Sequence, residues 1–172
     1  RKSRFADLWN IMFDRYTNYH NLNNLIWVWN PNAPNAYADP YDRYYPGHDK
    51  VDVLAADIYN NDYKKSHHDQ LVALGGGKPI AIGENGELPN PQTLQTSQPN
   101  WTWFMTWGKM LSDNNSDATI RSVYAHPYVL TRDEVDRNKF PDPADPGQPT
   151  DPTQPTDPTK PTDPVQPGQP TA

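Results

Sequence analysis

The sequence predicts an α/β fold built on a parallel sheet. Short apolar runs that read as strands alternate with helical or loop segments, which is the pattern of a parallel sheet. One strand, formed by Ile80–Ile82, is compact and delivers a carboxylate, Glu84, to its C-terminal end. Four strands are expected, and these make half of a (β/α)8 barrel, a fold that takes about 250 residues when complete.

The first element expected is an amphipathic helix over residues 3–19, because apolar side chains recur there at helical spacing. A strand over residues 25–29 follows by composition, and Asn30-Pro31 ends it. A loop rich in Asn, Tyr, Asp and Pro then runs to Gly47. The next strand, or a strand with its lead-in, is expected over residues 51–59.

A short helix is expected over residues 68–74, because Gly75–Gly77 can end it. The strand that carries Glu84 is expected over residues 78–83. A fourth strand and its loop are expected over residues 101–107, followed by a short helix and a closing segment to about residue 136. Alternation along the fourth strand places its tryptophans on one face, with at least one of them in the core.

The segment from Pro141 onward differs from the rest of the chain. It consists almost entirely of Pro, Asp, Thr and Gln, and a six-residue repeat recurs over residues 150–167. Such a composition cannot bury a core, so we expect residues 141–172 to be a disordered, semi-rigid spacer leading to another module. Residues 1–140 must then form the folded domain. The spacer holds four of the six net negative charges, so the acidic balance says little about a substrate.

The composition excludes several classes of function. The chain has no cysteine, so it has no disulfide and no Cys-based metal site. No clustered basic face points to nucleic acid, and no run approaches the roughly 20 apolar residues of a membrane span. The sequence starts without Met or a signal peptide and enters a helical pattern at once, so we expect a piece of a longer protein.

The candidate site lies where three expected strands end. Glu84 ends one strand, Asp57 and Tyr59 end the preceding one, and Trp107 follows the next. The carboxyl ends of parallel strands meet, and a phenol can hydrogen-bond a carboxylate there. A Trp face can hold the C–H face of a sugar, so together these residues describe one subsite of a glycosidase, an enzyme that uses paired carboxylates.

Other interpretations of these residues stay open at this point. Glu84 could be a solvated loop residue, Glu87 is a nearby rival carboxylate, and Asp57 could be a buried structural residue. His67-His68-Asp69 could ligate a metal, although a solvated loop is the favoured interpretation, and we expect neither a metal nor a cofactor.

Several segments together resemble glycoside hydrolase family 26, which is dominated by endo-β-1,4-mannanases. The resemblance covers most of residues 1–135, and the order and spacing of the segments make it fairly specific. The segments are Asn24–Asn32, Tyr44–Gly47, Val51–Val53 with Asp57–Tyr59, Lys78–Glu84, Trp103–Trp107 and His126–Tyr128.

This resemblance implies the C-terminal half of a (β/α)8 barrel, about strands five to eight. It implies that Glu84 is the nucleophile, that Tyr59 orients it and that Asp57 supports it. Trp107 would line the sugar subsite, with Trp29 and Trp103 as further substrate-binding candidates. The acid/base glutamate of the family lies upstream, on strand four, and no residue of this chain matches it.

The function implied by the resemblance is that of a retaining endo-β-1,4-mannanase, secreted and of bacterial origin, acting on mannan, galactomannan or glucomannan. The chain alone is expected to be inactive and marginally stable, because one carboxyl is missing and the half-barrel has open edges. Two alternatives remain: a related β-1,3-xylanase or mixed-linkage glucanase, and a non-catalytic carbohydrate-binding piece.

Overall fold

The computed structural model describes residues 3–131 and 134, and the chain divides into two units, Arg1–Glu134 and Val135–Ala172. The first unit holds every element described below. The predicted spacer over residues 141–172 lies outside the described residues, so the domain boundary at residue 140 stays a prediction. Within the described part of the chain, no helix combines the length and the apolar character needed to cross a membrane.

The core of the fold is a parallel sheet of four strands in the order β1-β2-β3-β4. The strands are β1 Val28–Trp29, β2 Val53–Ile58, β3 Ile80–Asn85 and β4 Trp101–Thr106. All four predicted strands are present. The predicted first strand over residues 25–29 was too long, because Leu25 and Ile26 are exposed and Trp27 pairs outside the ladder, accepting hydrogen bonds from the backbone N–H groups of Asp52 and Val53.

Helices and turns connect and flank the strands. The predicted first helix appears as α1 followed by a π-helical turn, and the predicted second helix is longer than expected. The elements are α1 Ser3–Asp14, η1 Arg15–Tyr19, η2 Tyr41–Arg43, η3 His48–Lys50, α2 Lys65–Gly75, α3 Pro91–Ser97, α4 Gly108–Asp113 and α5 Asp117–Tyr124. Helix α3 was not predicted, although Asn90 caps it by accepting from the Thr93 N–H and Pro91 occupies its first turn.

The two faces of the sheet bury different side chains. One face carries large residues such as Leu54, Ile58 and Ile80, which pack with Leu71 of α2 into the main core. The other face holds a small separate cluster of Val53, Ala55 and Ala81. The large residues therefore cover the helical side, which supplies most of the apolar burial that stabilises the unit.

The tryptophans of β4 and Trp107, which follows the strand, do not share one face. Trp101 is buried in the main core, and Phe104 packs against that core, whereas Trp103 and Trp107 are 42% and 47% exposed. The register between β3 and β4 shifts between Ile80 and Ile82, and this irregularity breaks the alternation of side chains. The prediction that at least one of these tryptophans lies in the core is therefore confirmed, and the prediction of a single face was wrong.

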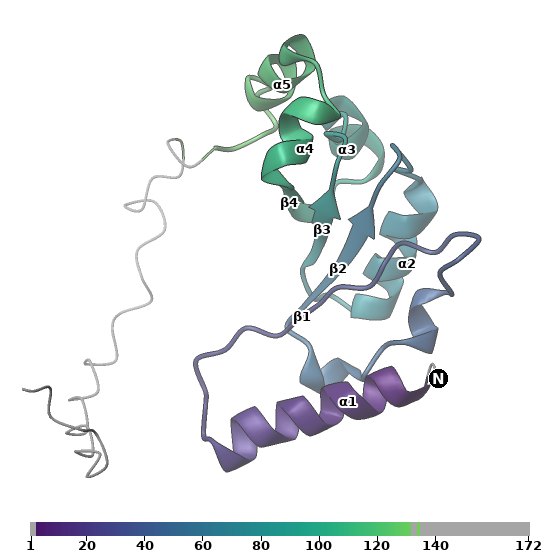
Figure 1. The fold of residues 1–172 in the computed structure, drawn as a ribbon, viewed down its shortest axis with the longest axis vertical. Helices are drawn as coiled ribbons and strands as arrows, with labels where there is room; N and C mark the ends of the chain where they lie inside the picture. The colour runs from purple at the N-terminus through teal and green to yellow at the C-terminus, as the bar shows by residue number, and fades with distance from the viewer. Residues whose placement is uncertain (1–2, 132–133, 135–172) are drawn as a thin grey trace, which may run out of the picture. The chain divides into compact units, whose positions relative to one another are not determined.

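The strands β2 and β3 run toward the end of the sheet where α3, α4 and α5 lie (Figure 1). The loop that follows β1, the turn that follows β2 and the turn that follows β3 all start at this carboxyl end, because the strands are parallel. The loops at this end of a parallel sheet are where ligand-binding side chains gather.

Candidate active site

Three predicted site residues meet at the carboxyl end of the sheet. Glu84 lies near the end of β3, Tyr59 directly follows β2, and Trp107 directly follows β4. The Tyr59 hydroxyl donates to Oε2 of Glu84 over 2.7 Å. The Trp107 indole N–H lies 2.7 Å from the Tyr59 hydroxyl oxygen and 3.3 Å from the same carboxylate oxygen. The carboxylate is thus held by donors from the two neighbouring strand ends.

The turn after Glu84 is fixed by a buried amide. Asn85, the last residue of β3, is fully buried. Its Nδ2 donates to the Thr106 hydroxyl and to the backbone carbonyl of Glu87, both over 2.9 Å. This fork joins the end of β3 to the end of β4, so the backbone that carries Glu84 has little freedom to shift.

Asn30 is a site residue that the sequence reasoning missed. Its Nδ2 donates to Oδ1 of Asp57 over 2.6 Å, so the first residue after β1 holds a carboxylate of β2. The amide lies directly over Gly83, where a Cβ atom would come within 1.9 Å of Asn30 Oδ1. The sequence signal was its position, since Asn30 follows a strand at the same end as Asp57 and Glu84.

A register shift aligns the two carboxylates. The pairing of β2 with β3 changes between Ala56 and Asp57, so that Ala56 pairs with Ile82 while Asp57 pairs with Glu84. Gly83 is the extra residue of β3 at this point. Without the shift, Asp57 would pair with Gly83, and Glu84 would lie one position further along the sheet edge.

The electrostatics of the site follow from burial and from the negative charge of Glu84. Burial raises the pKa of Asp57 to about 6, the Asn30 hydrogen bond opposes this, and the charge of Glu84 adds to it. Burial, followed by the hydrogen bond to Glu84, raises the pKa of Tyr59 to about 12. Tyr59 therefore stays protonated at neutral pH and remains a donor to Glu84.

The raised pKa of Asp57 predicts a pH dependence of stability. The folded pKa of about 6 lies above the ordinary 3.8, so folding favours the protonated acid. The stability that protonated Asp57 contributes to the fold is fully present below about pH 4 and is lost as the pH rises through 6. We expect Asp57→Asn to gain stability relative to the parent between pH 4 and pH 7, as measured by urea unfolding at each pH.

A matched control for this titration is Asp42→Asn, because Asp42 is an exposed aspartate of η2. Its pH profile should follow that of the parent. Parallel pH profiles for the Asp57→Asn variant and the parent would contradict the assignment of a raised pKa to Asp57.

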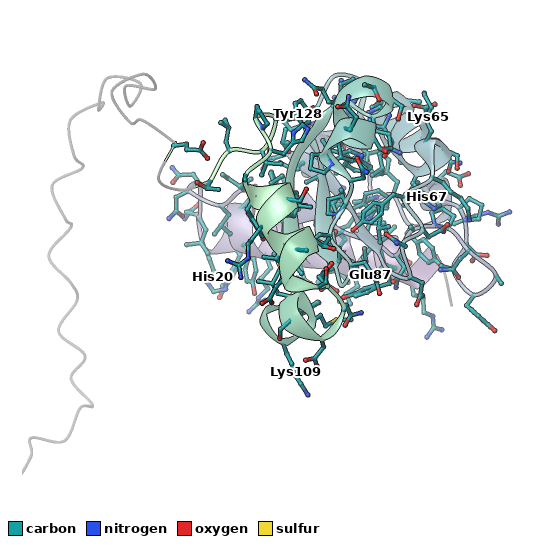
Figure 2. The ribbon with its side chains drawn as sticks, turned by 90° about the horizontal axis from the view of Figure 1, so that it is seen from above. His20, Lys65, His67, Glu87, Lys109 and Tyr128 are labelled. Atoms are coloured by element: carbon teal, nitrogen blue, oxygen red, sulfur yellow. The ribbon has the colours of Figure 1, made fainter. Side chains whose placement is uncertain are left out.

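The Glu87 carboxylate braces the turn after β3 through two hydrogen bonds. Its carboxylate accepts from Asn114 Nδ2 over 2.8 Å and from the backbone N–H of Asn61 over 3.4 Å. These hydrogen bonds, that of Asn114 first, hold the pKa of Glu87 below its usual range. Glu87, labelled in Figure 2, therefore ties the turn after β3 to the end of α4 and to the turn after β2.

Comparison with known proteins decides the family. The model of "Glycosyl hydrolase family 26" matches residues 1–134. The chain belongs to glycosyl hydrolase family 26. It is 40% identical over 134 residues to a mannan endo-1,4-beta-mannosidase of Thermothelomyces thermophilus, a match that spans 74% of this chain and 26% of that protein. The chain thus spans about a quarter of the length of this relative.

Solved structures of the family share the fold. GH26A from Muricauda sp. is 46% identical with a TM-score of 0.74, over 77% of this chain and 44% of that one. The Podospora anserina GH26-CBM35 beta-(1,4)-mannanase is 40% identical with a TM-score of 0.65, over 76% of this chain and 29% of that one. The four-stranded parallel sheet is therefore part of a family 26 (β/α) barrel, and the predicted fold class is confirmed.

In this family 26 chain the Trp29 side chain is buried and cannot contact a sugar. Its ring is 0% exposed and packs edge-on against Tyr41 and Tyr45, with centroids 6.2 and 5.1 Å apart. The prediction that Trp29 binds substrate is therefore wrong, because a ring buried on both faces offers no surface to a ligand. Trp103 and Trp107 keep exposed faces, so their substrate-binding roles stay predictions.

The two adjacent histidines have structural partners in this family 26 chain. His67 and His68 are buried on α2, so the favoured interpretation of a solvated loop was wrong. His67 Nε2, on the residue labelled in Figure 2, lies 3.1 Å from Asp62 Oδ2, and His68 Nε2 lies 3.1 Å from Asn100 Oδ1. Among the residues that the structure describes, no group of three His, Asp or Glu side chains is arranged to hold a metal.

Proposed function

We propose that this chain is part of a retaining endo-β-1,4-mannanase that hydrolyses mannan, galactomannan or glucomannan. The observation that carries the proposal is the Glu84 carboxylate, held by the Tyr59 hydroxyl over 2.7 Å at the carboxyl end of a parallel strand. Several relatives are named mannan endo-1,4-beta-mannosidases, which supports the choice of substrate. Family membership supports hydrolysis of a glycosidic bond as the reaction class.

In this proposal Glu84 is the nucleophile. The Tyr59 hydroxyl and the Trp107 indole N–H both donate to Oε2 of Glu84, and the indole N–H also donates to the Tyr59 hydroxyl oxygen. We therefore assign the attack on the anomeric carbon to the other oxygen, Oε1. A new C–O bond forms as the glycosidic bond breaks, and the leaving oxygen takes a proton from a second carboxyl about 5 Å away. Water, deprotonated by that same group, then releases the sugar and regenerates Glu84.

The second carboxyl is proposed to come from sequence outside these 172 residues, as the resemblance to the family implies. Asp57 is assigned the supporting role instead, because Asn30 holds it and it pairs with Glu84 across the strands. Because the second carboxyl is proposed to lie outside the 172 residues, we propose that this chain by itself turns over little or no mannan.

Trp107 is proposed to hold the sugar whose bond is cleaved. Its indole N–H is engaged by Tyr59 and Glu84, which fixes the ring beside the nucleophile, while 47% of the residue stays accessible. An aromatic face fixed in this way can carry the C–H face of a pyranose next to the attacked carbon.

The proposal is tested by trapping the intermediate. The full-length protein is incubated with a 2-deoxy-2-fluoro-β-mannosyl fluoride, and the labelled peptide is mapped by mass spectrometry. An adduct on Glu84 is expected, because the fluorine at C2 slows both the formation and the hydrolysis of the glycosyl-enzyme, whereas the good fluoride leaving group speeds only its formation. Hydrolysis of mannan with no adduct on Glu84 would break the residue assignment, and activity on β-1,3-xylan or mixed-linkage glucan alone would move the substrate to the alternatives.

The proposal extends to location and partners. We infer that the parent protein is secreted, because its polysaccharide substrate is too large to enter a cell. We also infer that the segment over residues 141–172 leads to a carbohydrate-binding module. One solved relative, from Podospora anserina, is a GH26-CBM35 mannanase, which supports such an arrangement.

Replacing Tyr59 by Phe tests how the nucleophile is oriented. The change removes the 2.7 Å hydrogen bond to Glu84 and one partner of the Trp107 N–H but keeps the ring. A hydrogen bond to a charged group contributes roughly 1.5–3 kcal/mol, so we expect kcat on mannan to fall about 10- to 100-fold. The control is Tyr16→Phe, on the π-helical turn η1. Equal kcat values for Tyr59→Phe and the parent would contradict this role.

A further inference from the structure

A cavity adjoins the cluster of Tyr59, Glu84 and Trp107 on the side of β1 and β2. It has a volume of about 510 Å³ and includes Asp57 and Tyr59 in its wall, so it begins at the side chain that touches Glu84. The rest of its wall comes from the loop after β1 and the turn after β2. These residues include Asn32, Asn35, Tyr37, Asn60, Asp62 and Lys64.

Tyr37 is presented to solvent by a braced turn. Asn35 Oδ1 accepts from the backbone N–H groups of Tyr37 and Ala38 over 2.7 and 3.0 Å. Asn35 also donates its own N–H to the Ala38 carbonyl and its Nδ2 to the Ala33 carbonyl, both over 3.1 Å. Tyr37 is fully exposed at the tip of this turn, so its aromatic ring stands at the rim of the cavity on a backbone that Asn35 holds in place.

The same ring borders another hollow along the loop. A cavity of about 350 Å³ shares Asn32, Tyr37 and Asp57 with the first and adds Tyr44 and Phe5 to its wall. The two cavities therefore share part of their wall, and together they are called the depression at Tyr37. By contrast, a cavity of about 710 Å³ between α3 and α5 includes neither Tyr59 nor Glu84 in its wall.

The polar groups of the 510 Å³ cavity suit an uncharged ligand. The Lys64 ammonium lies 2.8 Å from the Asp62 carboxylate, and His67 also contacts that carboxylate, so the single cation of the wall is already paired. The asparagine side chains of the wall offer amide donors and acceptors together. A polyhydroxylated ring uses both kinds of partner, whereas a phosphate or a carboxylate would need an available cation.

The position of the cavity indicates which sugar would enter it. Trp107 follows β4 and contacts Glu84 from one side, whereas the 510 Å³ cavity lies over the ends of β1 and β2, on the other side of Tyr59. A polysaccharide chain that rests on Trp107 and continues past Glu84 in this direction meets the depression at Tyr37.

We propose that the depression at Tyr37 is a second sugar subsite, in which the Tyr37 ring carries a hexopyranose of the bound polysaccharide beyond the sugar that rests on Trp107. This inference depends on the proposed function, because it assigns a further part of the same substrate. Asn35 acts as a positioning residue, since it holds the turn that presents the ring.

The test measures binding of mannohexaose by calorimetry to the full-length protein that carries Glu84→Gln, so that no hydrolysis occurs. Adding Tyr37→Ala is expected to weaken binding about five- to tenfold, as expected for the loss of one aromatic face. Adding Tyr37→Phe is expected to keep the affinity within about twofold of the starting protein, because the ring is retained. Tyr19→Ala is the matched control, since Tyr19 is an exposed tyrosine that borders neither cavity.

The outcomes separate this inference from the proposed function. No binding of mannohexaose by the Glu84→Gln protein would overturn both. Binding that Tyr37→Ala weakens no more than Tyr19→Ala does would overturn the subsite and leave the mannanase proposal standing. A loss with Tyr37→Ala that Tyr37→Phe restores would support the subsite, because a merely structural role for this fully exposed ring would not depend on its aromatic face.

Discussion

Glu84→Gln in the full-length protein is expected to lower kcat on mannan by about 10⁴- to 10⁶-fold, the range typical for loss of a covalent nucleophile. An amide oxygen is a very poor nucleophile toward the anomeric carbon. The substitution keeps the size of the side chain, and its carbonyl oxygen can still accept from the Tyr59 hydroxyl, which now lies 2.7 Å from Glu84 Oε2. Folding is therefore expected to survive, which circular dichroism and mannohexaose binding would check.

Glu87→Gln is the matched control for this substitution. Glu87 lies three residues further along the same turn, and its carboxylate accepts from Asn114 Nδ2 over 2.8 Å, a hydrogen bond that a glutamine oxygen can also accept. We expect kcat to change less than about fivefold. Similar losses for the two variants would show that the turn matters as a unit, and the nucleophile would then have to be sought elsewhere.

Azide gives the Glu84 prediction a chemical readout. Glu84→Ala opens space at the face that the carboxylate occupied, and azide entering there can attack an activated aryl β-mannoside. The expected product is the α-mannosyl azide, with the configuration inverted, and turnover should recover in proportion to azide concentration. Recovery through a β-mannosyl azide would assign Glu84 the acid/base role instead.

Gly83→Ala in the full-length protein is expected to lower the stability by about 3 kcal/mol and to lower kcat about 10- to 100-fold. The added Cβ would lie 1.9 Å from Asn30 Oδ1 and 2.5 Å from Asn30 Cγ, so the amide must move. Moving it breaks the 2.6 Å hydrogen bond that holds Asp57 beside Glu84. Urea unfolding measures the stability loss, and kcat on mannan measures the effect on the site.

Gly108→Ala is the control for this prediction. A Cβ at Gly108 would have no atom within 4 Å apart from its chain neighbours and the backbone of its own helix, and Gly108 starts α4, so we expect unchanged or slightly raised stability. The pair Asn30→Ala and Gly83→Ala should be non-additive, because removing the Asn30 amide makes room for the Cβ. Full additivity of the two changes, or a Gly83→Ala variant as stable as the parent, would contradict the predicted steric conflict.

The sequence alone was enough to predict the strands and the central carboxylate. The apolar run Ile80–Ile82, bounded by Pro79 and by Gly83, identified β3 and placed Glu84 at its end. Tyr59 and Trp107 could be assigned to the same end because strands of one parallel sheet finish at one edge. These predictions rest on local periodicity and on chain direction, which neighbouring residues specify.

The tertiary structure decided what depends on pairing and burial. It showed that Trp29 is covered by Tyr41 and Tyr45, that His67 is buried against Asp62, and that Asn30 reaches from β1 over Gly83 to Asp57. Each of these contacts joins residues that the local pattern does not connect. A shift in register between strands likewise leaves no local signal, because the energy that selects it comes from packing between the strands and not from either strand alone.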